Sequence, residues 1–260
     1  MKVCITGHTR GIGKATAKML EEDGHEIIGA STSTGVNVLR TTRTVNWILK
    51  EDPDVFVNNV YAPDSQVHIL YKLYEQWQYK DKLIINLSST SADSIGSFQE
   101  MGYNKHWTPY ISDKARLNFA SSYLSERFNK VHKCRITNLV PGFVNTSAVA
   151  LFKAFLEPSD FLSPEEVATY IKWIIDQPKH IQIKSISMNV GNSRIPMRRE
   201  RQYTLKTYDK DGNRNDPDKD IVEDTRRGWE NTKTDQSMFD EETGIQYGQN
   251  LTQVWEPKEK

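Results

Sequence analysis

The chain has 260 residues, a length that suits one α/β domain with an additional segment better than two full domains. It carries 34 lysines and arginines against 34 aspartates and glutamates, so its formal net charge is zero. Nucleic-acid-binding domains usually have a basic excess that this chain lacks, and we expect no nucleic-acid partner.

The two cysteines and the length of the apolar runs indicate the cellular compartment of the protein. Cys4 and Cys134 fall in predicted core strands, where we expect small buried thiols in a reducing environment and no disulfide framework. No apolar run has membrane-spanning length, and the sequence opens directly on a predicted core strand, so we expect neither a signal peptide nor an anchor. We therefore expect a cytoplasmic protein that makes no membrane contact.

The first 22 residues predict a strand, a glycine-rich turn and a helix. Residues 2–5 form a short apolar run typical of a strand, and residues 14–22 have helical spacing. Residues 6–13 between them read TGHTRGIG. Glycine permits a tight bend and a close approach to a ligand, and a helix N-terminus offers amide donors to a pyrophosphate. This combination predicts a dinucleotide site.

The pattern TGxxxGIG resembles the glycine turn of the short-chain dehydrogenase/reductase family, in its compact branch. The resemblance implies a doubly wound parallel sheet with helices on both faces, the Rossmann fold, and a nicotinamide cofactor. It also implies the residues of the turn that bind this cofactor, which are Gly7, Thr9, Arg10, Gly11, Ile12 and Gly13.

The end of the second predicted strand, residues 25–30, favours NADP (NADPH) over NAD. An acidic residue at this place would bond the adenosine ribose and select NAD, but the sequence continues with hydroxyls, beginning at Ser31. Arg10 adds a guanidinium that suits a phosphate, unless it is simply a solvated loop charge. Asn37 and Val38 then resemble the family's Asp-Val pair beside the adenine, with Asn37 where an aspartate is usual.

The third predicted strand, residues 54–59, is followed by a departure from the family pattern. Residues 58–61 read NNVY and resemble Asn-Asn-Ala-Gly, in which the amides of Asn58 and Asn59 would tie neighbouring strands together and border the cofactor. The next predicted helix, residues 63–80, lacks the asparagine with which the family holds a relay water. Gln66 or His68 could substitute, but we favour a packing or surface role for both.

Three residues are candidates for catalysis. Ser89 ends the fourth predicted strand, residues 82–89, at the edge where open α/β sheets bind ligands. Tyr110 and Lys114 are four residues apart and share one helix face. The resemblance implies that Ser89 bonds the substrate oxygen, Tyr110 gives the proton, and Lys114 bonds the nicotinamide ribose and lowers the pKa of the tyrosine. Tyr103 lies nearer the family's spacing from the serine, but no lysine follows it four residues later.

The fifth predicted strand, residues 134–140, leads into PGFVNT, which matches the family's Pro-Gly-x-Val-x-Thr. Residues 147–156 correspond to the family's mobile lid. Serine, proline and two glutamates at 163–166 predict the start of a helix, and residues 181–190 predict the last strand. The resemblance implies that the nicotinamide is bordered by Pro141, Gly142, Val144 and Thr146.

We divide the chain into a cofactor-binding and catalytic domain, residues 1–192, and a charged extension, residues 193–260. The extension has too few apolar residues to build a core, and its scattered aromatics indicate partial order or docking on a surface. Residues 203–208 predict one arm of a hairpin.

These patterns predict an NADP-dependent oxidoreductase that interconverts a carbonyl and an alcohol of a small molecule by hydride transfer, with no metal. The resemblance further implies a homo-oligomer, either a dimer or a tetramer. A catalytically silent NADP-binding regulator or scaffold that uses the extension for a partner is the alternative. A sugar-nucleotide epimerase of the extended branch is disfavoured by the glycine spacing and the short substrate region.

Overall fold

The computed structural model describes residues 1–93, 107–149 and 157–191, and five short strands between residues 203 and 257. It divides into two compact units, Met1–Ser193 and Arg194–Lys260, which are described separately below. Tyr103, the alternative to Tyr110, and residues 150–156 of the predicted lid lie outside the described residues. Among the described helices, none has both the length and the apolar character that a membrane crossing requires.

The first unit alternates strands with helices and has one parallel sheet, as the sequence predicts. The strand order is β2-β1-β3-β4-β5-β6, and every pairing is parallel. The strands are β1 (Lys2–Thr6), β2 (Glu26–Ala30), β3 (Val55–Asn58), β4 (Leu83–Leu87), β5 (Arg135–Pro141) and β6 (Ser185–Met188). The helices are α1 (Gly11–Glu22), α2 (Thr41–Glu51), α3 (Ser65–Trp77), α5 (Trp107–Ser125) and α6 (Pro164–Ile175), with 3-10 turns η1 (Thr32–Thr34), η2 (Thr90–Asp93) and η4 (Pro158–Asp160).

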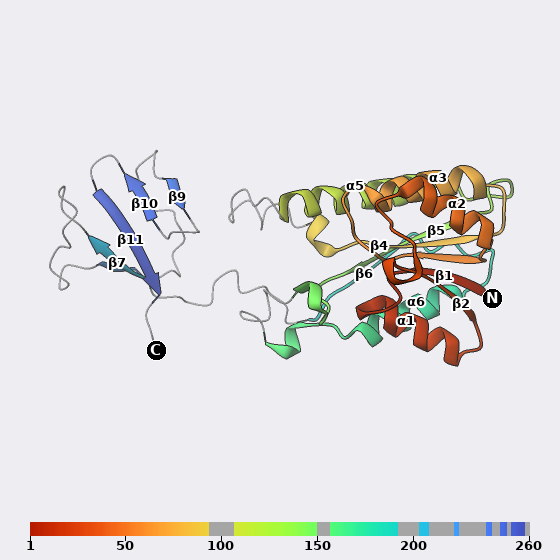
Figure 1. The fold of residues 1–260 in the computed structure, drawn as a ribbon, viewed down its shortest axis with the longest axis horizontal. Helices are drawn as coiled ribbons and strands as arrows, with labels where there is room; N and C mark the ends of the chain where they lie inside the picture. Colours follow the sequence, from red (N-terminus) through yellow and green to blue (C-terminus); the bar gives the residue numbers. More distant parts are fainter. Residues whose placement is uncertain are drawn as a thin grey trace. The chain divides into compact units, whose positions relative to one another are not determined.

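Helices cover both faces of this sheet (Figure 1). Helices α2, α3 and α5 lie on one face, and α1 and α6 lie on the other. The first face buries a core cluster that includes Phe56, Leu70 and Trp77, and the second buries one that includes Leu20 and Ile171. Strands β3 and β4 are buried along their whole length, which explains their continuous apolar sequences. The doubly wound fold predicted from the sequence is confirmed.

Local signals set some element boundaries and tertiary contacts set others. Helix α6 starts with the predicted capping box, in which the Ser163 hydroxyl accepts from the Glu166 N–H at 3.1 Å and the Glu166 carboxylate accepts from the Ser163 N–H. Helix α1 begins at Gly11, three residues before the predicted start, so two glycines of the turn lie inside its first turn. Helix α5 likewise begins at Trp107, which places Tyr110 within the helix.

The register of the parallel strands brings three asparagines into one row. Asn58 of β3 lies beside Asn86 of β4, and Asn86 lies beside Asn138 of β5. Because parallel strands end at a common edge, the segments that follow β1, β3, β4 and β5 all leave the sheet at this edge. The polar residues of these segments form the candidate site.

The second unit contains an antiparallel sheet of its own. The described strands follow the order β8-β7-β11-β10-β9, and β11 pairs with both β7 and β10. Strand β7 coincides with the predicted hairpin arm and pairs antiparallel with β8. The bounds are β7 (Tyr203–Thr207), β8 (Ile221–Glu223), β9 (Met238–Asp240), β10 (Ile245–Gly248) and β11 (Leu251–Pro257).

Candidate active site

The glycines of the turn after β1 lie so close to neighbouring atoms that a side chain would collide with them. Gly7 has φ +72°, and a Cβ placed on it would lie 2.2 Å from Cγ2 of Val60. A Cβ on Gly13 would lie 2.3 Å from the carbonyl oxygen of Gly7. The Gly7 N–H donates to the Ala30 carbonyl at 2.7 Å, which fixes the turn beside the end of β2. Neither glycine leaves space for a side chain.

The segment after β3 holds this turn in place through hydrogen bonds to Thr6. The Asn59 side chain donates from Nδ2 to the Thr6 carbonyl at 2.8 Å. The Thr6 hydroxyl accepts from the backbone N–H groups of Asn59 and Val60, at 2.8 and 3.1 Å. Asn59, the second asparagine of the pair, therefore ties the segment after β3 to the start of the glycine turn.

The N-terminus of α1 is open to an anionic ligand. Arg10 stands at the N-cap position, is exposed with its neighbour Thr9, and makes no side-chain capping bond. The first turn, which includes the partly buried Ile12, contains no acidic residue. Thr146 reaches this point, because its Cγ2 lies 3.2 Å from the position of a Cβ on Gly11. The structure thus brings the predicted segments after β1 and β5 together.

The other predicted residues after β5 shape the chain beside β6. Pro141 ends β5, and the N–H of Gly142 donates to the Met188 carbonyl at 2.8 Å. A Cβ on Gly142 would lie 2.1 Å from Oδ1 of Asn189, so a side chain here would displace the Asn189 amide. Val144 is buried and forms a parallel bridge with Leu162.

The end of β2 is lined with hydroxyls. The Ser31 hydroxyl lies 2.6 Å from that of Ser33, and Thr34 Oγ1 donates to the Gly29 carbonyl at 2.9 Å. Asn37 Oδ1 accepts from the Leu39 N–H at 3.0 Å, so its side chain stabilises the turn before α2. Val38 is buried.

The three predicted catalytic residues converge at the carboxyl edge of the sheet. Ser89 is buried, and its hydroxyl lies 2.8 Å from that of Ser91 and forms a hydrogen bond with Tyr110. Lys114 is only 3% exposed, and its Nζ lies 5.5 Å from the ring centroid of Tyr110. Ser88 points away from this group, because its hydroxyl donates to Asn118. A hydroxyl, a phenol and an amine therefore share one small site.

The pKa shifts in this group correct one expectation. Burial raises the pKa of Tyr110, and the hydrogen bond with Ser89 opposes the rise. Burial lowers the pKa of Lys114 to about 7, against the opposing charge of Asp113. The expectation of a lowered pKa for Tyr110 is not met, because removal from water dominates both groups and disfavours their charged forms.

The comparisons with known proteins agree with this geometry. No protein-family model matches the chain. An uncharacterized oxidoreductase of Staphylococcus aureus strain N315 is 23% identical over 228 residues, which cover 71% of this chain and 94% of that protein. The 3-alpha-hydroxysteroid dehydrogenase from Pseudomonas sp. B-0831, solved with NADH, aligns with a TM-score of 0.56 at 18% identity. This alignment covers 74% of this chain and 96% of that one.

A third similar protein is named as a short-chain dehydrogenase/reductase. A short-chain dehydrogenase/reductase from Brucella melitensis aligns with a TM-score of 0.54 at 16% identity, over 73% of this chain and 95% of that one. The chain has the fold of these dehydrogenase structures. The aligned structures include one solved with NADH and another, a serine dehydrogenase, solved with NADP+, so the fold is seen with either nicotinamide cofactor.

Gln66 is the first departure from the family pattern that the structure explains. Its side chain is buried, and its Oε1 accepts from Lys114 Nζ at 2.8 Å. Gln66 is thus buried, which fits the packing half of the expectation, and it also contacts Lys114, whereas His68 is exposed. The signal that could have found Gln66 is its place in the first turn of α3, directly after the Asn-Asn segment.

Asn58 is buried and ties neighbouring strands together. Its Nδ2 donates to the Gln66 carbonyl at 3.0 Å and to Asn86 Oδ1 at 2.9 Å. Asn86 in turn donates to the Ser121 hydroxyl of α5 at 3.0 Å. This agrees with the strand-tying part of the expectation for Asn58, and the cofactor-bordering part stays a prediction for both asparagines.

Tyr61 is the second departure, at a position where the family has glycine. Its ring meets that of Tyr110 edge to face, with centroids 4.8 Å apart, and lies 5.6 Å from Lys114 Nζ. The phenol donates to the Asp113 carboxylate at 3.3 Å, and burial together with Asp113 raises the pKa of Tyr61 to about 12. The bulkier side chain therefore covers the lysine and flanks the candidate acid.

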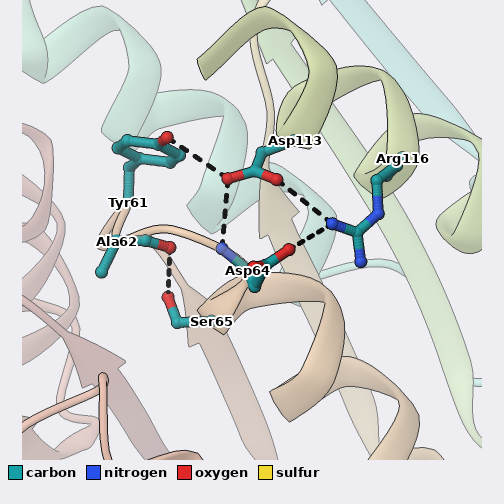
Figure 2. A network of polar contacts seen from close by, with 6 residues as sticks. All are labelled: Tyr61, Ala62, Asp64, Ser65, Asp113 and Arg116. Carbon is teal, nitrogen blue, oxygen red and sulfur yellow. Dashed lines mark hydrogen bonds and ion pairs between the residues drawn. The ribbon is translucent and has the colours of Figure 1, made fainter. Parts of the chain in front are cut away.

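A charged network holds Tyr61 in this place (Figure 2). Asp113 accepts from the phenol, from the backbone N–H of Asp64 at 3.1 Å and from Arg116 at 3.3 Å, and Arg116 also pairs with the Asp64 side chain. Residues from the loop before α3 and from α5 thereby meet beside the site. No local pattern predicts this network, because its members are 49 to 52 residues apart across the two segments.

Proposed function

We propose that the chain is an NADP-dependent oxidoreductase that interconverts a carbonyl and an alcohol of a small molecule. The observation that carries the proposal is that Ser89, Tyr110 and Lys114 converge at the sheet edge where the glycine turn lies. Gly7 and Gly13 of that turn have no space for a side chain. The oxidoreductase named in the sequence comparison and the dehydrogenases with this fold support the reaction class.

The residues present fit a nicotinamide dinucleotide. Gly7 and Gly13 keep the turn free of side chains, and the first turn of α1 presents uncapped N–H groups without a competing carboxylate. Arg10 and Ser31 lie on the two segments that the hydrogen bond from Gly7 to Ala30 holds together, and residues 31–38 include no acidic side chain. We propose that Arg10 and Ser31 favour a 2′-phosphate, hence NADP over NAD.

We assign the chemistry to the chain's own groups as follows. When bound, the nicotinamide cofactor supplies or takes the hydride. Ser89 donates a hydrogen bond to the substrate oxygen, and Tyr110, which is hydrogen-bonded to Ser89, gives or takes the proton on that oxygen. Lys114 holds a ribose hydroxyl. When the Lys114 amine is protonated, its positive charge favours the phenolate form of Tyr110.

Replacing the candidate acid tests the proposal. Tyr110→Phe removes the proton donor and leaves the ring contact with Tyr61, so we expect turnover to fall by about two to four orders of magnitude with little change in cofactor affinity. Tyr123→Phe is the matched control, since Tyr123 is exposed on the same helix. NADPH oxidation against ketones and aldehydes measures the rate, and cofactor fluorescence measures binding. Equal rates for Tyr110→Phe and wild type would show that Tyr110 is not the acid.

A second function has one observation in its favour. Tyr61 fills space beside Tyr110 and Lys114 where the family has glycine, as expected of a protein that binds NADP without turning over substrate. Tight NADPH binding without reduction or oxidation of any substrate in the same assay would favour that regulatory reading.

We also propose the setting of this activity. The exposed aromatic residues Tyr71, Phe119 and Tyr123 on α3 and α5 support a homo-oligomer, and the predicted reducing compartment for Cys4 and Cys134 supports a cytoplasmic location. The unit formed by residues 194–260 is assigned an accessory role, because the residues of the candidate site all lie in the first unit.

A further inference from the structure

The Gln66 side chain uses all of its polar atoms inside the protein. Its Nε2 donates to the Asn58 carbonyl at 2.7 Å and to the Leu87 carbonyl at 3.0 Å. Its Oε1 accepts from Lys114 Nζ at 2.8 Å. Carbonyl oxygens can only accept, so the two backbone partners fix which end of the amide faces Lys114. The amide is thus oriented by β3 and β4 and presents its oxygen to α5.

The Lys114 ammonium is held just as closely. Its Nζ donates to the Gln66 Oε1 and to the Leu87 carbonyl at 2.6 Å, which gives two of its three N–H groups fixed directions. Its other charged and titratable neighbours are Tyr61 and Tyr110, whose rings flank it, and Asp113. Arg116 shares Asp113 through an ion pair.

We propose that Gln66 is a positioning residue that holds Lys114 at the end of β4, beside Tyr110, by a direct hydrogen bond. The placement of Lys114 stands on the contacts in this chain, whereas its consequence for turnover rests on the proposed function. A neutral acceptor is suited to this role, because it stabilises the ammonium without the strong charge attraction of a carboxylate.

The competing explanation is purely structural. Gln66 also ties β3 to β4 through the carbonyls of Asn58 and Leu87, and this tie alone would explain its burial. Gln66→Glu and Gln66→Met separate the two roles. Both variants lose the two donors and keep about the same side-chain size, but only glutamate keeps an acceptor toward Lys114. A purely structural role predicts that Gln66→Met leaves the titration of Lys114 at its wild-type midpoint, whereas a positioning role predicts a lower midpoint, because the ammonium loses its acceptor.

The experiment follows Lys114 in the full-length, cofactor-free chain. Lysine labelled with 13C at Cε reports its own protonation by NMR, and the signal missing in Lys114→Met assigns it. We expect a wild-type midpoint near 7, as the burial of the amine implies. Gln66→Glu should raise the midpoint by about one to three pH units, because a carboxylate at hydrogen-bond distance favours the ammonium. Gln66→Met should lower it below the wild-type value, because the ammonium loses an acceptor.

Two controls keep the outcome decisive. Thermal unfolding of each variant verifies the fold, and Gln66→Asn, which draws the acceptor back by one methylene, replaces the glutamate variant if that variant does not fold. With asparagine we expect a midpoint below the wild-type value. Midpoints that agree across wild type and all folded variants would overturn the inference.

Activity provides a separate readout. If the wild-type enzyme turns over a substrate, the pH profile of kcat should move with the Lys114 midpoint in Gln66→Glu. A chain that shows the NMR shift but no turnover would refute the proposed function and leave the positioning role intact. A chain with turnover but no NMR shift would refute the positioning role alone.

Discussion

The two units of the chain build their sheets in opposite ways. The first has a parallel sheet whose strands are covered by helices on both faces, and the described part of the second is a small antiparallel sheet. In a parallel sheet the carboxyl ends of all strands lie at one common edge. Gly7, Asn58, Ser89 and Gly142 therefore gather there although they are far apart in sequence. In an antiparallel sheet, successive strands end at opposite edges. This difference explains why all predicted chemistry falls in the first unit.

The largest expected effect comes from the glycine turn at that common edge. In Gly7→Ala the backbone must keep φ +72° with a Cβ that would lie 2.2 Å from Val60. We expect the free energy of unfolding to fall by about 2 to 4 kcal/mol from backbone strain and overpacking together, with loss of cofactor binding. Urea denaturation and NADPH fluorescence measure the two effects.

A control and a rescue separate strain from collision. Gly35 has φ +82° but nothing within 4 Å of a Cβ, so Gly35→Ala should cost only about 1 kcal/mol. Adding Val60→Ala to Gly7→Ala removes the colliding methyl group and should recover part of the lost stability. No recovery in the double variant would mean that the packing between these two segments is not what requires glycine.

A smaller effect is expected from the charge on the same turn. Arg10→Ala removes the guanidinium that we assign to the 2′-phosphate, and we expect NADPH to bind about tenfold more weakly, the size of one charge-assisted hydrogen bond at an exposed site. NADH affinity should stay the same. Lys18→Ala is the control, because Lys18 is an exposed cation of the same helix paired with Glu22. Equal weakening of both cofactors in Arg10→Ala would remove the basis for NADP preference.

The smallest effect is expected from the second unit. A chain that ends at residue 192 keeps every residue of the candidate site, and we expect NADPH affinity within about twofold of the full chain, as for independent regions. Fluorescence titration measures it, and circular dichroism verifies the fold. If the shortened chain did not fold, or lost the cofactor, the second unit would have to be counted as part of the enzyme.

Sequence alone predicted the parallel sheet, the glycine turn and the convergence of Ser89, Tyr110 and Lys114, because these depend on local patterns and on strand ends. It missed the hydrogen bond between Gln66 and Lys114, which are 48 residues apart and meet only in the folded chain. It also gave the wrong direction for the pKa of Tyr110, since a spacing of four residues does not reveal how far burial removes both groups from water.

The asparagine row has a consequence for how the protein folds. Asn58 bonds Asn86 across 28 residues, and Asn86 bonds Ser121 across a further 35. These amides are satisfied only when β3, β4 and α5 are all in place, and each buried amide left unpaired costs about 1 to 3 kcal/mol. Partly assembled sheets are therefore unstable, and closing such long loops slows the folding reaction. We therefore expect the central sheet and helix α5 to be completed together in one cooperative step.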